Sequence, residues 1–184
     1  MAFQKYGWDL LAFAGSIIGG IITYLGVKMT ITSQREDRKV DKYYQDISVL
    51  YYIVNNTSFI KNVEIFECGE ELEDGSYKVN ISDTLAMQLD YIVDFMDIVQ
   101  DKISDLIKSL DVDSFAVLDV NMKNLSGARL FVKEFDLYFR RDGENRMKER
   151  VSKYIDISEK IHKLIEDHMD DRTTEYLKIK KKTN

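Results

Sequence analysis

The stretch LLAFAGSIIGGIITYLGV, residues 10–27, carries no charge over eighteen residues, and the rest of the chain is organised around it. As a helix rising 1.5 Å per residue it would cover about 27 Å, close to the hydrocarbon thickness of a bilayer, roughly 30 Å. Tyr6 and Trp8 precede it and Tyr24 lies near its exit, where amphipathic rings meet the headgroups. The stretch therefore predicts one N-terminal transmembrane helix after a short extracytoplasmic segment, residues 1–9.

Two other interpretations of this stretch fit the sequence less well. A cleaved signal peptide favours a basic start, a shorter apolar run and a cleavage site between small residues. Here only Lys5 precedes the run, and Lys28 and Met29 follow it. A helix that is apolar all round and buried in a soluble core needs a large domain to surround it, and the remaining chain is too highly charged for that.

The basic residues beside the run predict its orientation. Lys5 and the amino terminus lie on one side, and the other side carries Lys28, Arg35, Arg38, Lys39 and Lys42. Because cytoplasmic flanks are enriched in Lys and Arg, we expect the N-terminus outside and the remainder in the cytoplasm, at the inner (cytoplasmic) membrane of a bacterial cell. The single Cys68 agrees, since it cannot form an internal disulfide.

Small residues form a stripe along the predicted span. Gly15, Gly19 and Thr23 recur every four residues, and Ser16 and Gly20 lie one position over. Such stripes let two helices approach closely, which predicts that the protein is a homo-oligomer. The alternative, that Gly and Ser are simply frequent in membrane spans, is equally open.

Apolar spacing predicts the helices beyond the span. The chain contains no proline, so nothing forbids long helices. The first cytoplasmic helix is predicted to continue the span as a juxtamembrane rod over 28–66, with the apolar seam Val40, Tyr43, Ile47, Leu50 and Val54. Glu67 to Asp83 contains Gly69 and Asp74-Gly75, which predicts a loop with a short strand over Tyr77-Val79-Ile81.

The remaining segment, 67–184, is predicted to complete a cytoplasmic bundle. A second helix capped by Ser82 or Asp83 has the seam Leu85, Leu89, Ile92, Met96, Val99, Ile103, Leu106 and Leu110. Phe115–Leu118 is either a short helix or a strand pairing with the Tyr77 segment. A third helix runs from Ala128 to Phe139. The last begins near Glu144, with the seam Met147, Val151, Tyr154, Ser158, Ile161, Ile165 and His168.

Together these elements predict an all-α protein: one N-terminal span continuing into an antiparallel four-helix bundle. Alternating helix directions bring the basic C-terminal tail back toward the inner leaflet. Its lysines, Lys178, Lys180, Lys181 and Lys182, are candidate ligands of anionic lipid headgroups. A frayed, solvated tail is the equally open alternative.

Acidic residues dominate the middle of the chain. Residues 67–143 hold 8 Lys/Arg and 17 Asp/Glu, a net charge of −9, which argues against nucleic acid as a partner. Five aspartates recur three or four residues apart on the second helix, opposite its seam: Asp90, Asp94, Asp97, Asp101 and Asp105. We call this set the acidic strip. It is either a solvated face, which is the favoured interpretation, or a docking strip for a basic partner, which would be a cytoplasmic protein or the basic face of the last helix in a neighbouring subunit.

Candidate metal or catalytic residues are few. Glu159 and His162 form one Glu-x-x-His unit, with Glu166 a turn further on, whereas a di-metal bundle site needs two such units. The other histidine, His168, falls on the apolar seam. No glycine-rich phosphate loop follows a strand, and Cys68 lacks a partnered histidine. We therefore expect no metal, no cofactor and no enzymatic activity.

In overall plan the chain resembles small single-pass bacterial membrane proteins with a cytoplasmic helical domain, a group that includes membrane effectors of phage-defence systems. The resemblance covers the span and its juxtamembrane rod, includes no diagnostic motif, and transfers no functional residue. It implies a self-associating signalling or effector subunit whose cytoplasmic domain senses a partner or small ligand, in one version defending against phage by membrane disruption. The alternative is a passive anchor or scaffold that docks a cytoplasmic protein through the acidic strip.

Overall fold

The computed structural model describes residues 2–183, and the side chains of residues 19–181. Nearly all of this chain is helical, and the strands found in it are two short ones that form a hairpin. The all-α fold predicted from the apolar spacing is therefore confirmed.

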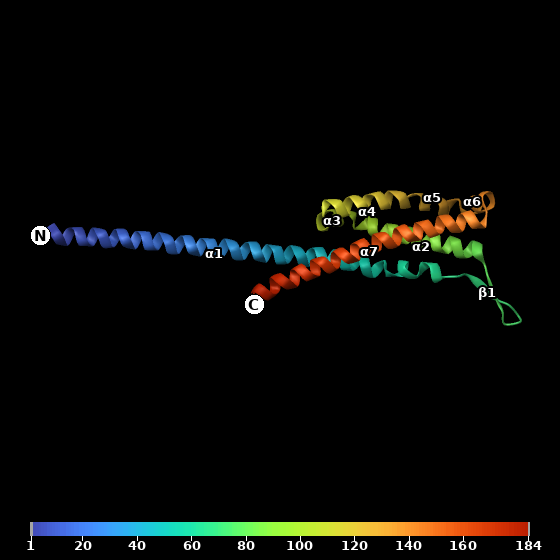
Figure 1. Cartoon of the computed structure of the whole chain (residues 1–184), viewed down its shortest axis with the longest axis horizontal. Coiled ribbons are helices and arrows are strands. Elements are labelled where there is room, and N and C mark those ends of the chain that lie inside the picture. The colour runs from blue at the N-terminus through green and yellow to red at the C-terminus, as the bar shows by residue number, and fades with distance from the viewer. Residues whose placement is uncertain (1, 184) are drawn as a thin grey trace.

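Four helical arms run alternately away from the N-terminus and back toward it (Figure 1). The first arm is α1 (Ala2–Asn56), followed by the 3₁₀ helix η1 (Ser58–Ile65), and the second comprises α2 (Ile81–Asp101) and α3 (Ile103–Ser109). The third comprises α4 (Val112–Leu125), α5 (Gly127–Lys133) and α6 (Phe135–Asp142), and the fourth is α7 (Glu144–Thr183). This is the predicted antiparallel bundle order, and α7 begins at the predicted residue.

The α7 helix is the centre of the bundle, because it packs against α1, η1, α2, α4 and α6. Its core face consists of Met147, Val151, Ile155, Ile161 and Ile165, each at most 2 % exposed. Of the predicted seam, Tyr154 and His168 are only partly buried. The opposing α2 buries its predicted seam and also Phe95, so the bundle has one continuous apolar core.

The α1 helix leaves the bundle as a bare rod toward the N-terminus (Figure 1). Its described side chains from Gly19 to Lys39 are all exposed, and packing begins at Val40 and Tyr43. Within the residues whose side chains are described, no helix combines the length and apolarity needed to cross a membrane. Residues 10–18 of the predicted span fall outside them.

The first arm does not stay helical to the predicted end near Phe66. It ends at Asn56, where Thr57 adopts φ −112° and ψ 6° and η1 follows. The buried Thr57 hydroxyl donates to the Ile53 carbonyl at 2.7 Å and also contacts α7, which fixes this change of direction.

The second arm is interrupted where one helix was predicted. Its N-cap is Asn80, rather than Ser82 or Asp83, because the Asn80 side chain accepts from the Asp83 backbone N–H. The helix breaks at Lys102, and α3 resumes with Ile103 half-buried and Leu106 buried. The spacing of the apolar seam continues unchanged across the break at Lys102, so periodicity alone did not reveal the break.

The hairpin and the third arm correct two further predictions. The strand predicted over 77–81 forms at β2 (Tyr77–Val79), and it pairs antiparallel with β1 (Gly69–Glu71). Phe115–Leu118 lie within α4, so the strand alternative for them was wrong. The predicted third helix is divided at Glu134, where φ is −119° and ψ 25°, and this bend lets Ala128 and Phe135 both reach the core.

Candidate ligand-binding cleft

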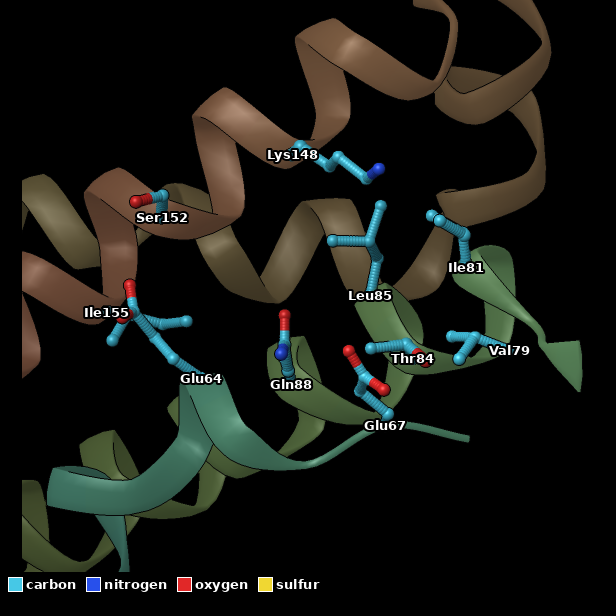
Figure 2. A pocket seen from close by; sticks show the side chains of 10 residues that line it. All are labelled: Glu64, Glu67, Val79, Ile81, Thr84, Leu85, Gln88, Lys148, Ser152 and Ile155. Atoms are coloured by element: carbon cyan, nitrogen blue, oxygen red, sulfur yellow. The ribbon is translucent and has the colours of Figure 1, made fainter. Parts of the chain in front are cut away.

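A cleft of about 340 Å³ lies at the hairpin end of the bundle, opposite the bare N-terminal rod (Figures 1 and 2). Its walls come from the end of η1, from β2, and from the first turns of α2 and α7. The polar lining consists of Glu64, Glu67, Thr84, Gln88, Lys148 and Ser152, and the apolar lining of Val79, Ile81, Leu85 and Ile155. We call this site the distal cleft. Its volume lies at the lower end of the range for small-molecule pockets.

Two buried polar side chains of α2 hold the acidic wall of the cleft in place. The Gln88 amide nitrogen donates to the carbonyl oxygens of Val63 and Phe66, at 3.2 and 3.4 Å. One turn earlier, the Thr84 hydroxyl accepts the backbone N–H of Cys68 at 2.8 Å. The segment that carries Glu64 and Glu67 is therefore attached to α2 on both sides of Glu67.

The same bonds orient the other end of the Gln88 side chain. Because both partners of its amide group are carbonyl oxygens, the nitrogen must face them and the Oε1 must face away. Figure 2 shows this oxygen directed into the cleft. Gln88 is only 7 % exposed, and Oε1 accepts no hydrogen bond from the described part of the chain. The cleft thus contains a fixed, unpaired acceptor.

The local charge of the distal cleft is negative. Within the described residues, neither Glu64 nor Glu67 makes an ion pair, and both are exposed. Lys148, on the opposite wall, is paired with Glu144, with 2.6 Å between Nζ and Oε1. On α7, burial first, and then the nearby charges of Glu64 and Asp156, raise the pKa of Glu159.

The Glu-x-x-His unit on α7 does not form a joint ligand face. Glu159 is exposed, whereas His162 is buried with its Nδ1 2.9 Å from the Thr57 hydroxyl. Glu166 binds the Lys61 ammonium through both carboxylate oxygens, at 2.8 and 2.9 Å. Among the described residues, no group of three or more His, Cys, Asp and Glu side chains is arranged to hold a metal ion.

The acidic strip lies on the exposed side of α2 and α3, and part of it is neutralised within the chain. Asp97 binds Arg129 of α5, Asp101 binds Lys102, and Asp105 binds Lys108. Asp90 and Asp94 are exposed and, in the described part of the chain, make no ion pair. These two aspartates of the five therefore carry the charge that is not paired within the described chain.

The predicted span stripe and basic tail are partly within the described side chains. A β-carbon added at Gly19 or Gly20 would meet nothing within 4 Å, and Thr23 donates to the Gly19 carbonyl at 2.8 Å. Gly15 and Ser16 lie outside. In the tail, Lys178, Lys180 and Lys181 are exposed, with Lys180 over the Tyr176 ring, and Lys182 lies outside.

Sequence reasoning missed the distal cleft because its lining comes from four separate segments. The available signal was the polar pair Thr84 and Gln88, one turn apart and directly beside the seam residues Leu85 and Leu89. Because buried polar side chains are hydrogen-bonded, such a pair indicates that this part of the helix packs against polar groups, here the backbone of another segment. No protein-family model, curated protein or solved structure matches the chain.

Proposed function

We propose that the protein is a non-enzymatic, single-pass membrane protein that self-associates and acts as a signalling or effector subunit. Its N-terminus is outside the inner membrane, and its helical bundle senses a partner or ligand in the cytoplasm. Residues 10–27 supply the span.

One observation carries this proposal. The α1 helix is continuous from Ala2 to Asn56, so the predicted span and the bundle share one helix. Between the end of the span at Val27 and the first packed residue, Val40, lie about 20 Å of helix at 1.5 Å per residue. Because this rod has no break, a change in how the bundle holds α1 would tilt or rotate the span as well.

The span itself has room for a second helix. Gly19 and Gly20 have no neighbours within the described part of the chain, and their small size would allow the backbones of two copies to approach. We infer that bundle packing controls how the spans of neighbouring copies associate. If the protein acts like the membrane effectors of phage-defence systems that it resembles, this rearrangement disrupts the membrane and so defends the cell against phage.

Replacing Gly15 and Gly19 by Leu tests the proposal in the full chain. We expect light scattering in detergent to show a defined oligomer for the wild type and a smaller species for the double variant. Ile17→Leu with Ile21→Leu, on the opposite face of the span, is the matched control and should keep the oligomer. In cells, overexpression should arrest growth and admit a membrane-impermeant dye, and both effects should disappear with the Gly variants. An unchanged mass and unchanged toxicity would refute the proposal.

The second candidate function is a passive anchor that docks a basic cytoplasmic protein on the acidic strip. The observation that favours it is the pair Asp90 and Asp94, which are exposed and unpaired within the described chain. Asp90→Lys with Asp94→Lys should then abolish recovery of the partner from cell membranes while the protein still inserts. Asp136→Lys, the same reversal at an exposed position of α6 outside the acidic strip, serves as the control.

A further inference from the structure

We propose that the distal cleft binds a small organic cation, an ammonium or guanidinium group carried on an apolar body. This cation would be the ligand that the bundle senses in the proposed function. Binding itself does not require the proposed function, but the effect of binding on the span does.

The cleft offers acceptors where a cation would need them. Gln88 Oε1 is fixed and unpaired within the described chain, on a side chain more than nine-tenths buried, and it points into the cleft (Figure 2). An N–H of a ligand in the cleft could donate to this oxygen, which has both of its lone pairs available. Glu64 and Glu67 lie on the same side, on a segment that Gln88 and Thr84 hold against α2. The acceptors are therefore in place before the ligand arrives.

The negative charge of the cleft favours a ligand with a positive charge. Two carboxylates without ion-pair partners in the described chain would repel an anion and attract a cation. The cation on the opposite wall does not cancel them, because Lys148 is engaged by Glu144. A ligand ammonium would be bonded by the Gln88 oxygen and paired with the glutamates.

The apolar lining selects the body of the ligand. Leu85 comes from α2, Ile155 from α7, and Ile81 lies near the hairpin, so the apolar side chains approach from different elements (Figure 2). A hydrated metal ion would gain nothing from this lining, whereas an aryl or alkyl group would bury apolar surface on it. The position also suits sensing, since η1 directly follows α1 and packs on α7 and α2.

Three probes that share a phenethyl body test the assignment with the full chain in a non-ionic detergent. Isothermal titration at pH 7 compares phenethylamine, which is cationic, with neutral 2-phenylethanol and anionic 3-phenylpropionate. We expect phenethylamine to bind at least about tenfold more tightly than the alcohol, as for a site whose polar groups must be paired, and the acid not to bind. Equal affinity of amine and alcohol, or no binding by the amine, overturns the proposal.

Matched variants locate the binding. Glu64→Gln and Glu67→Gln should each weaken phenethylamine about fivefold, as the loss of one partly exposed ion pair would. Glu73→Gln, the same change in the hairpin loop, is the control and should leave the affinity unchanged. Gln88→Met should also weaken binding, and its thermal unfolding is recorded to exclude loss of the fold. Binding that survives all three cleft variants would place the amine elsewhere and overturn the assignment.

The mass of the protein is measured in the same samples. If phenethylamine binds but the oligomer does not change, the ligand assignment stands and the coupling to the span fails. If the Gly15→Leu and Gly19→Leu variant is dissociated yet binds the amine normally, assembly and recognition are separate properties. Failure of the ligand assignment and failure of the proposed function are therefore distinguishable.

Discussion

Thr57 and His162 join the end of α1 to the middle of α7, with 2.9 Å between Oγ1 and Nδ1 and both residues at most 1 % exposed. With the Thr57 hydroxyl donating to the Ile53 carbonyl, we assign the imidazole proton to His162 Nδ1, which then donates to Thr57 Oγ1. His162 Nε2 is then unprotonated, buried and without a partner in the described chain. A second proton there would bury an unpaired charge.

The first prediction concerns the pH dependence of stability. Burial first, and then the charge of Lys61, lower the pKa of His162 below its ordinary 6.5, while Glu166 opposes them. The unfolded chain therefore binds the proton at higher pH than the folded chain. Stability is fully present above about pH 6.5 and falls as pH falls toward the folded pKa. By pH 5.5 the loss from this residue is at most about 1.4 kcal/mol.

Chemical denaturation at pH 7.5 and 5.5 measures this loss. His162→Gln keeps a donor for Thr57 but does not titrate, so its stability should lack that part of the pH dependence. His168→Gln is measured for comparison, because this second histidine lies on the same helix with its Nε2 3.6 Å from Asp111 and its contribution has to be separated from that of His162. A pH slope that is identical in the wild type and His162→Gln would contradict the prediction.

The second prediction concerns the ion pair beside this contact. Lys61 binds both oxygens of Glu166, and its charge is one cause of the lowered pKa of His162. Lys61→Met removes that charge and leaves Glu166 free, so the pKa of His162 should rise in an NMR titration. The pair is about half exposed, and its loss should cost at most about 1 kcal/mol of stability. Lys160→Met, an exposed neighbour on α7, should leave the pKa unchanged.

The third prediction concerns the planar guanidinium of Arg172, which holds α7 against α1 and α3. It donates to the Ser109 carbonyl at 3.2 Å and to Glu175 at 3.1 Å, and it lies 5.5 Å from the centroid of the Tyr43 ring. A lysine ammonium cannot make these three contacts together. Arg172→Lys should therefore lower the free energy of unfolding by about 1–2 kcal/mol.

Arg140→Lys, an exposed exchange on α6, provides the comparison for Arg172 and should leave stability within about 0.5 kcal/mol. Equal stability of the two variants would show that the guanidinium geometry does not matter. Denaturant unfolding of the full chain in detergent gives both values.

The fourth prediction separates the two halves of the acidic strip. Asp97 binds Arg129 across α2 and α5, whereas Asp94 is unpaired within the described chain. Asp97→Lys places two cations together and should destabilise the bundle by up to about 1 kcal/mol. Asp94→Lys should leave the melting temperature unchanged or raise it, because it relieves repulsion along the strip. The reverse order of melting temperatures would contradict the ion pair.

Periodicity predicted the parts of the fold that depend on one helix face at a time. The seams of α2 and α7, from Leu85 to Val99 and from Met147 to Ile165, are largely buried as their spacing indicates. Helix ends were less predictable, because single contacts with residues distant in sequence decide where a helix ends. Thr57 ends α1 through a bond to His162, which is 105 residues away in sequence.

The candidate site was not predictable in the same way. Glu64, Gln88 and Lys148 lie far apart in sequence and meet only because η1, α2 and α7 pack together. Gln88 itself looked like an ordinary polar residue beside the seam, and its role depends on the carbonyls of Val63 and Phe66. Hydrogen bonds between a side chain and a distant backbone leave no periodic pattern.

The last prediction concerns the turn between α6 and α7, where Gly143 lies between the two helices. Gly143 adopts φ +78° and ψ 165°, a conformation that is nearly restricted to glycine. Its backbone N–H donates to the Phe139 carbonyl at 3.0 Å, and its own carbonyl accepts from Met147 at 3.2 Å. The residue therefore ends one helix and starts the next at a positive φ that glycine adopts without a β-carbon clash.

Gly143→Ala must either keep that angle with a β-carbon or give up these two bonds. We expect the free energy of unfolding to fall by about 1–3 kcal/mol. Asn145→Ala, an exposed exchange in the first turn of α7, is the control and should change it by less than about 0.5 kcal/mol. Because Met147 leads the buried face of α7, a shifted turn would also loosen the nearby cleft wall at Lys148 and Ser152. Phenethylamine affinity should then fall with stability in Gly143→Ala, and a loss of stability with unchanged affinity would show that the cleft is independent of this turn.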